Sequence, residues 1–124
     1  MTNIEKHFIE SSKTILSLKN FEREINEIIK SILKCDKDEK KILIAGNGGS
    51  CSDAEHFAGE LLCTFSNRNR KSFSAIPLTS HSAALTAWSN DFEFESFFKR
   101  EVNAHGKKGD ILFLLACKTI LSED

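Results

Sequence analysis

Hydrophobic residues recur along the first third of the chain at the spacing of an α-helix. They form one stripe made of Phe21, Ile25, Ile28, Ile29, Ile32 and Leu33. Asn20 can cap this helix because its side-chain oxygen can accept hydrogen bonds from the free backbone amides of the first turn. Glu22 and Glu24 follow in that turn, where the helix dipole favours negative charge. A shorter pattern of the same kind precedes it, at Ile4, Phe8, Ile15 and Leu16. Residues 1–35 are therefore predicted to form a helical hairpin or one long bent helix.

Beyond residue 41, short hydrophobic runs alternate with helical patterns. The runs lie at 42–45, 73–78 and 111–116, and the helical patterns at 52–65, 82–88 and 94–104. A continuous apolar run of this length suits a strand buried on both faces, and strands that alternate with helices predict a parallel sheet. Pro77 fits the end of its strand because proline has no amide to donate to a ladder. The charge-rich residues 35–41 are expected to form a solvated connection.

Composition and charge narrow the class of protein. The chain has 124 residues, of which 40% are hydrophobic and 28% charged, a balance typical of one soluble globular domain. A net charge of −1 provides no field that would attract nucleic acid or an anionic membrane. No apolar run approaches the roughly 20 residues that span a bilayer. We therefore expect a cytoplasmic protein that binds neither nucleic acid nor membranes.

The four cysteines indicate a reducing compartment. Cys35, Cys51, Cys63 and Cys117 are far apart and include no CxxC pair, which fits neither a zinc ribbon nor a disulfide framework. Each is more readily explained as a small apolar side chain.

The segment with the clearest chemistry is a glycine-rich stretch, residues 45–55, between a predicted strand and a predicted helix. Ser52 and Glu55 match the S-x-x-E capping box, so the helix is expected to start near Asp53 with its free amides directed into the glycine loop. Glycines let the backbone approach a ligand closely, and the helix dipole adds partial positive charge. The stretch is thus expected to hold a phosphate, although a plain tight turn is the alternative.

Two other phosphate motifs do not fit this stretch. Walker A requires a lysine, and none occurs between Lys41 and Lys71. A dinucleotide fingerprint requires a third glycine where Cys51 stands and an acid about 20 residues later, but residues 61–90 contain no Asp or Glu. The same window contains Arg68, Arg70 and Lys71, which favours an anionic ligand without a ribose.

Two further pairs are candidates for site residues. His56 and Glu60 are four residues apart on the helix after the glycines, so they share a face and could bind a divalent metal or place a carboxylate base beside a sugar. A surface ion pair is the alternative. Asn90 and Asp91 are expected in a loop, where Asp91 either caps the next helix or contributes to ligand binding. A nearby aromatic cluster is more typical of a core or a subunit interface; it consists of Phe92, Phe94, Phe97 and Phe98.

Taken together in this order, these segments resemble the phosphoheptose isomerase family, part of the sugar isomerase (SIS) superfamily. The matching residues are Gly46-Asn47-Gly48-Gly49-Ser50, Asp53-Ala54, His56-Phe57-Ala58, Glu60-Leu61, Ile76-Pro77-Leu78-Thr79, Asn90-Asp91-Phe92 and Gly109-Asp110-Ile111-Leu112. The resemblance is close over residues 40–115 and looser before them. It implies an SIS-type three-layer α/β/α domain at residues 36–124, with an incomplete parallel sheet of about three strands. Residues 1–35 would be an N-terminal helical segment at the interface of a homotetramer.

The resemblance also implies an activity and roles for individual residues. The reaction would be the aldose-ketose isomerisation of sedoheptulose 7-phosphate to a heptose 7-phosphate, for synthesis of cell-surface polysaccharide precursors. Substrate would meet Asn47, Gly48, Gly49, Ser50, Glu60, Asn90 and Asp91. His56 and Glu60 would be two zinc ligands, and Glu60 would also be the base that moves a proton between C1 and C2 through an enediol.

The chain departs from the family pattern near its end. Where the family has a Ser-Thr-Ser-Gly phosphate loop, this sequence has Ala116-Cys117-Lys118-Thr119. The later family elements, which supply a Gln, a His and a partner acid/base, do not follow, and we expect that a frameshift or early stop has shortened the gene. The alternatives to an active isomerase are a catalytically incomplete sugar-phosphate-binding SIS module and a truncated remnant.

Overall fold

The computed structural model describes residues 1–116 and divides the chain into two compact units. The first unit is Met1–Lys34 and the second begins at Cys35. None of the helices within residues 1–116 is both long enough and apolar enough to cross a membrane. The cysteines in this part, Cys35, Cys51 and Cys63, form no disulfide, and Cys117 lies outside the described residues.

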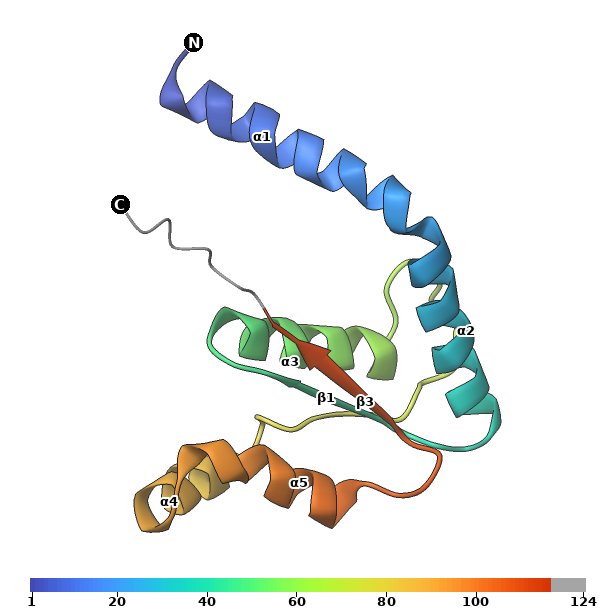
Figure 1. Ribbon diagram of the computed structural model, residues 1–124. Coiled ribbons are helices and arrows are strands. Elements are labelled where there is room, and N and C mark those ends of the chain that lie inside the picture. Colours follow the sequence, from blue (N-terminus) through green and yellow to red (C-terminus); the bar gives the residue numbers. More distant parts are fainter. Residues whose placement is uncertain (117–124) are drawn as a thin grey trace. The chain divides into compact units, whose positions relative to one another are not determined.

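The N-terminal residues form one bent helical path, not a hairpin (Figure 1). Helix α1 (Asn3–Ser17) is followed by a 3-10 turn (Leu18–Phe21) and helix α2 (Glu22–Lys37). The expected cap at Asn20 is wrong, because this residue already lies inside the 3-10 turn and the chain does not leave helical geometry there. Most hydrophobic side chains of the two predicted helical patterns are exposed, Phe8 to 71% and Phe21 to 54%.

The end of α2 corrects part of the expected solvated connection at 35–41, of which residues 37–40 are exposed as predicted. Helix α2 continues to Lys37, and the Cys35 side chain is buried, with its thiol donating to the carbonyl of Lys41. Burial raises the pKa of this thiol above its ordinary value. Cys35 is therefore an apolar filler at the start of the second unit.

The second unit contains a parallel sheet with strand order β2-β1-β3, as the alternating pattern predicted. Strand β1 (Ile42–Gly46) is central and buried along its whole length, which explains its continuous apolar run. It pairs with β2 (Ala75–Pro77) on one side and with β3 (Ile111–Leu115) on the other. Pro77 is the last residue of β2, where a ladder donor is not needed.

Helices cover both faces of the sheet and produce the expected three layers (Figure 1). Helix α3 (Gly49–Leu62) packs on one face through buried Ala54 and Ala58. The rings of Phe57 and Phe113 pack edge to face, with their centroids 5.3 Å apart. Helix α4 (Ser82–Asp91), a 3-10 turn (Phe94–Ser96) and helix α5 (Phe97–His105) lie on the other face. There the core contains Leu43, Ala45 and Leu78, with Phe98 and Val102 packed against it.

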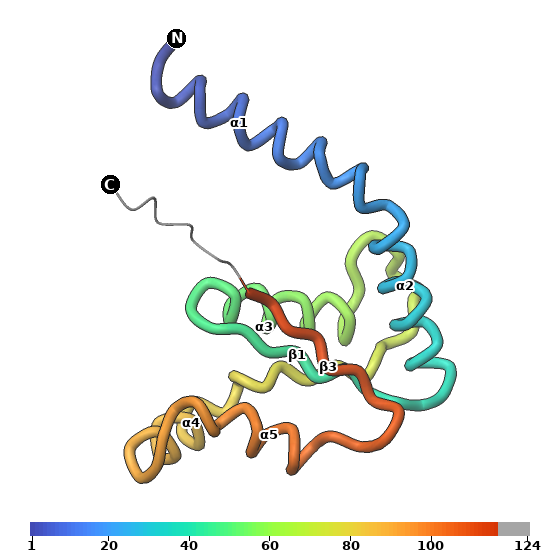
Figure 2. Tube along the Cα trace, viewed as in Figure 1, coloured from blue at the N-terminus to red at the C-terminus, as the bar shows by residue number. Residues whose placement is uncertain are grey.

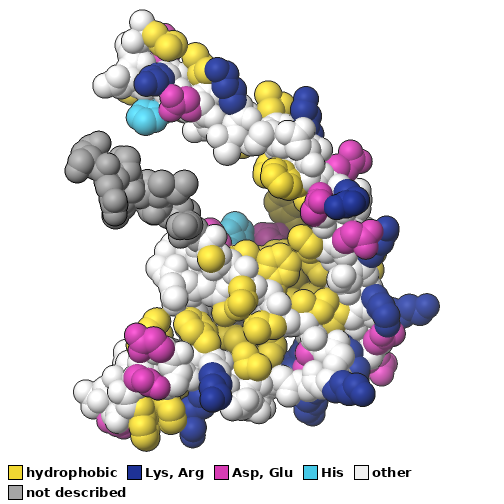
Figure 3. Space-filling view, viewed as in Figure 1, with side chains coloured by type: hydrophobic (Ala, Val, Ile, Leu, Met, Phe, Trp, Pro, Cys, Tyr) yellow, Lys and Arg dark blue, Asp and Glu magenta, His cyan; other side chains and the backbone are white. Residues whose placement is uncertain are grey.

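Strand β3 forms one edge of the sheet in residues 1–116 and carries exposed hydrophobic side chains. Leu112 is 47% exposed and Leu114 is 67% exposed. Their register places them beside Leu43 and Ala45, on the face covered by α5. In Figure 3, hydrophobic side chains gather in the middle of the face where β3 lies.

A buried ion pair joins the residues that immediately precede β1 and β3. The Lys41 ammonium lies 2.6 Å from an Asp110 carboxylate oxygen, and the Asp110 side chain is only 6% exposed. Asp110 also accepts hydrogen bonds from the amides of Lys41 and Lys107, at 3.1 and 2.7 Å. Burial alone would raise the pKa of Asp110, but the hydrogen bonds from Lys41 and Lys107 outweigh it and hold the pKa below its ordinary value.

Candidate functional site

The glycine bend connects β1 to α3 and begins the helix one turn earlier than expected. Helix α3 starts at Gly49, and its N-cap is Gly48, with φ 57° and ψ −123° and no side-chain cap. Ser52 is therefore inside the helix, and the predicted Ser52–Glu55 capping box is wrong. The physical reason is that Gly48 can adopt a positive φ, which lets the turn close immediately, with the Cys51 amide donating to the Gly48 carbonyl at 3.0 Å.

Gly46 is needed in the bend for a different reason, the close approach of backbone. A Cβ atom added there would lie 2.3 Å from the carbonyl oxygen of Ser50. Figure 2 follows the chain from β1 around this bend into α3. A side chain at position 46 would force the bend to open.

The head of α3 presents free amides to solvent. The amides of Ser50 and Cys51 donate to Asn47 and Gly48 within the bend, which leaves the amides of Gly48 and Gly49 without an acceptor in the described residues. Asn47, Gly48 and Gly49 are exposed. Such amides at a helix N-terminus are suited to binding an anion or a hydroxyl group.

A cavity of about 820 Å³ opens beside the bend. Its walls combine the polar groups of the loop with apolar groups of α5 and β3, and they consist of Ala45, Gly46, Asn47, Gly49, Ser50, Asp53, Phe98, Leu114, Leu115 and Ala116. This volume is within the range of small-molecule sites. Asp53, Phe98 and Leu114 were not among the predicted site residues. Asp53 could have been found from the sequence, since it precedes His56 by one helical turn.

The structure brings His56 and Glu60 together on α3. Their Nε2 and Oε1 atoms are 3.3 Å apart, and the side chains are 79% and 40% exposed. The other carboxylate oxygen of Glu60, Oε2, is buried and has no hydrogen-bond partner in the described part of the chain. An unpartnered buried carboxylate oxygen is costly, so this atom is available for a ligand, a metal or a proton.

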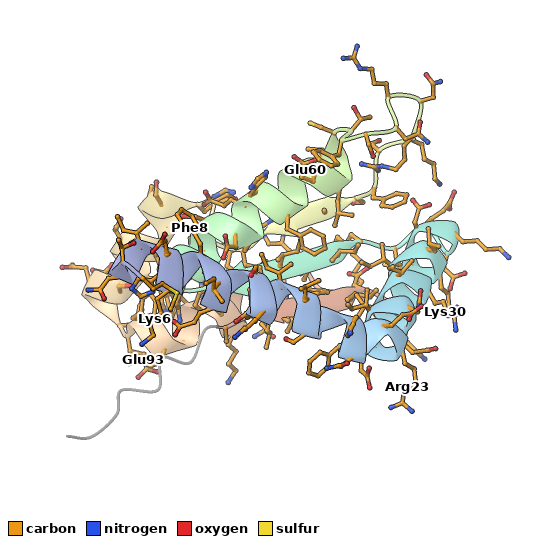
Figure 4. All side chains as sticks on the ribbon, turned by 90° about the horizontal axis from the view of Figure 1, so that it is seen from above. Lys6, Phe8, Arg23, Lys30, Glu60 and Glu93 are labelled. Atoms are coloured by element: carbon orange, nitrogen blue, oxygen red, sulfur yellow. The ribbon has the colours of Figure 1, made fainter. Side chains whose placement is uncertain are left out.

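The pair does not belong to the wall of the cavity. Asp53 does line the cavity and lies on the same face of α3 as this pair. Glu60, however, is two turns further along the helix, about 10 Å along its axis. Figure 4 shows Glu60 toward the carboxyl end of α3. The three side chains therefore form a polar row that leads from the cavity along one face of the helix.

Two donors fit half of a four-coordinate metal site. An imidazole nitrogen and a carboxylate oxygen are both accepted zinc ligands, and the unpartnered Oε2 of Glu60 is consistent with this use. Residues 1–116 contain no group of three or more His, Cys, Asp or Glu side chains that could hold a metal ion. Further ligands are thus not provided by the described residues.

Asn90 and Asp91 lie at the end of α4, not in a loop. The Asn90 amide donates to the Asp91 carboxylate at 2.9 Å, and both residues are exposed. Asp91 does not cap the next helix, because α4 extends through it and the following N-caps are Glu93 and Ser96. Neither residue lines the cavity at the glycine bend.

Two of the three cations expected to favour an anion are already engaged. Lys71 pairs with Asp36 at 2.8 Å, and the guanidinium of Arg70 donates to backbone carbonyls at the end of α3. Arg68 is exposed. The predicted departure from the family phosphate loop, Cys117-Lys118-Thr119, lies outside the described residues.

Comparison with known proteins agrees with this architecture. The model of the SIS domain family matches residues 7–118. Phosphoheptose isomerase of Clostridium acetobutylicum is 37% identical over 107 residues, covering 86% of this chain and 54% of the relative. That of Helicobacter pylori strain P12 is 39% identical over 110 residues, covering 88% and 57%.

Solved structures give the same result. The phosphoheptose isomerase of Neisseria gonorrhoeae superimposes with a TM-score of 0.83 at 32% identity, covering 93% of this chain and 59% of that one. The enzyme of Francisella tularensis gives 0.80 at 29% identity, with coverage of 95% and 63%. The chain therefore spans little more than half the length of these relatives. Because the family model covers most of the sequence and the parallel sheet superimposes on these structures, the chain belongs to the SIS domain family.

Proposed function

We propose that this chain takes part in the isomerisation of sedoheptulose 7-phosphate to a heptose 7-phosphate, a precursor of cell-surface polysaccharide. The named relatives support the reaction, and the open glycine bend supports binding of a sugar phosphate. The observation that carries the proposal is the buried Oε2 of Glu60, which has no partner in the described residues and lies on the helix face that leads from the cavity.

The proposed roles follow the predicted site residues. Asn47, Gly48, Gly49 and Ser50 bind the substrate through amides and polar side chains, and Asn90 and Asp91 contribute from α4. Glu60 is the base. Its carboxylate removes the proton from C1 of the ketose and returns it to C2, while the hydroxyl proton of O1 passes to O2 through the enediol.

Zinc is the proposed cofactor, with His56 and Glu60 as two of its ligands. When bound, such an ion polarises a carbonyl oxygen as a Lewis acid. We further propose a cytoplasmic homotetramer that buries the exposed hydrophobic stripe of residues 1–35 between subunits.

A coupled assay of the purified chain, with and without added zinc, tests the function. We expect measurable turnover of sedoheptulose 7-phosphate and a loss of roughly 10²- to 10⁴-fold in kcat for Glu60→Gln. Glu55→Gln is the matched control, because Glu55 is an exposed carboxylate on the same helix, and it should retain activity. Absence of turnover by the unmodified chain under both conditions would contradict the proposed reaction.

A second candidate function starts from the same pair, His56 and Glu60, which lies in no group of three or more His, Cys, Asp or Glu side chains within residues 1–116. In this alternative the chain binds a sugar phosphate without converting it. Thermal unfolding distinguishes the two, since a ligand at one hundred times its Kd adds about 2.7 kcal/mol to the free energy of unfolding. Stabilisation by sedoheptulose 7-phosphate without turnover would favour the binding module.

A further inference from the structure

The carboxyl end of α3 requires donors for its last carbonyl groups. The helix ends at Leu62 and has no basic residue in its last turn. The Cys63 amide closes the turn by donating to Gly59 at 2.8 Å, but the carbonyls of Glu60 and Leu61 would have no partner from the helix itself. Something outside the helix must satisfy them.

Arg70 supplies these donors from the following loop. Its Nη1 donates to the Leu61 carbonyl at 2.9 Å, and its Nη2 donates to the carbonyls of Cys63, at 2.8 Å, and of Glu60. Nη1 also donates to the Lys71 carbonyl at 2.8 Å. The planar, permanently charged guanidinium suits this task because its donors are fixed in a fork.

The contacts of Arg70 are reinforced by Phe73. The guanidinium lies 4.8 Å from the centre of the Phe73 ring, and the Phe73 amide donates to the same Leu61 carbonyl at 3.0 Å. The guanidinium charge also opposes the negative end of the helix dipole. The last turn of α3 is thus held by two residues of the loop that leads to β2.

This arrangement acts on the backbone of Glu60 itself. We propose that Arg70 is a positioning residue for Glu60: by binding the Glu60 backbone carbonyl and its neighbours, it fixes the turn that directs the Glu60 side chain toward His56. This inference rests on the proposed role of Glu60 as the base. The hydrogen bonds of Arg70 go to backbone carbonyl groups and its guanidinium lies over the Phe73 ring, so we expect its effect on the reaction to pass through Glu60.

The test compares Arg70→Ala and Arg70→Lys with Arg68→Ala in the full chain. Arg68 is an exposed arginine two positions away that has no hydrogen bond to residues 1–116, which makes it a matched control. Three quantities are measured at a temperature where all variants are folded. The first is the set of imidazole proton resonances of His56, which are assigned by comparison with His56→Gln. The second is the hydrogen-exchange rate of the Cys63 amide. The third is the pair of kinetic constants kcat and KM of the isomerisation.

For Arg70→Ala we expect the His56 resonances to move and Cys63 exchange to accelerate at least roughly tenfold, the factor for losing a hydrogen bond to a charged group. The kcat should fall by about tenfold or more with little change in KM. Arg70→Lys should recover part of each effect, since one ammonium cannot span the separated carbonyls. Arg68→Ala should match the unmodified chain.

Unchanged His56 resonances in folded Arg70→Ala would overturn the proposal, and so would equal changes in Arg68→Ala. A lower melting temperature with unchanged resonances and unchanged kcat per folded molecule would also overturn it, because that result shows a purely structural role. Should Arg70→Ala not fold, Arg70→Lys decides between the same outcomes. If the unmodified chain shows no turnover, the proposed function fails, while the resonances and the exchange rate still decide whether Arg70 orients Glu60.

Discussion

The side of the sheet where the parallel strands begin, here called the amino edge, and the side where they end, the carboxyl edge, satisfy their polar groups in opposite ways. At the amino edge, Asp110 accepts three hydrogen bonds from Lys41 and Lys107. Because α3 runs antiparallel to the strands, its carboxyl end lies on this side, where Arg70 binds its carbonyls. The polar groups described there are completed by the protein itself.

At the carboxyl edge, several polar groups remain incomplete. The amides of Gly48 and Gly49 have no acceptor in residues 1–116, and the buried hydroxyl of Thr79, just after β2, has no partner there either. The exposed amides of Gly48 and Gly49, at the bend beside the cavity, can accept a ligand, and the Thr79 hydroxyl is an exception to the rule that buried polar groups are paired. Contacts that stabilise the fold and groups that can bind a ligand therefore lie at opposite edges. Glu60 combines both, with its carbonyl held by Arg70 and its Oε2 left without a partner.

Breaking the completed edge should produce the largest loss of stability. Asp110→Asn removes the charge that faces Lys41, whose side chain is only 19% exposed, and we expect the free energy of unfolding to fall by roughly 3 kcal/mol. Urea unfolding at neutral pH measures this. Glu10→Gln is the control, because its pair with Lys6 is exposed and its loss should cost no more than about 0.5 kcal/mol. Equal effects of the two substitutions would contradict the assignment of stability to the amino edge.

A smaller loss is expected from the open edge. Gly46→Ala introduces a Cβ atom 2.3 Å from the Ser50 carbonyl oxygen, so the bend must shift, at a cost of roughly 2 kcal/mol. Gly59→Ala is the control in the same helix, since a Cβ atom there has no neighbour within 4 Å, and it should stabilise the protein by up to about 1 kcal/mol. The same unfolding measurement applies. A Gly46→Ala chain as stable as the original would show that the bend has room to relax.

The smallest expected effect is a change of the unfolding free energy with acidic pH. The pKa of Asp110 is held below its ordinary value, so its contribution to stability is complete above about pH 4 and is lost as the pH falls through the lowered folded-state pKa. The difference in unfolding free energy between the unmodified chain and Asp110→Asn should therefore narrow below pH 4. A difference that stays constant down to pH 2 would show that the charge of Asp110 is not what stabilises this edge.

The sheet could be predicted from the sequence because its signal is local. Strand β1 is buried on both faces, and its run Ile42-Leu43-Ile44-Ala45 contains no polar position. Strand β3 has an equally apolar sequence, although Leu112 and Leu114 are exposed on one face, and the strand ends at Leu115, one residue before the end of the predicted run. Strand and helix alternation then determines that the strands are parallel.

Capping residues show where local reading fails. Thr2 and Glu5 form a true capping box at the start of α1, with both reciprocal hydrogen bonds present. Ser52 and Glu55 have the same spacing but no such role, because Gly48 starts the helix first. The motif is informative only where its first residue is itself outside helical geometry, as Thr2 is.

The candidate site was predicted in part for a similar reason. The glycines, His56 and Glu60 are neighbours in sequence or on one helix, so their spacing is visible. Phe98 and Leu114 reach the cavity from distant elements, and Arg70 reaches the Glu60 carbonyl across ten residues of chain. Such contacts depend on tertiary packing, which no periodicity encodes.

The central position of β1 has a consequence for biosynthesis. Its partner β3 begins far along the chain, as the 69-residue separation of Lys41 and Asp110 shows. At translation rates of about 5–20 residues per second, the ribosome needs roughly 3 to 14 s to make that stretch. Throughout this interval β1, which is buried along its whole length in the folded chain, lacks its β3 partner, and its unpaired edge is then most exposed to pairing with the wrong chain.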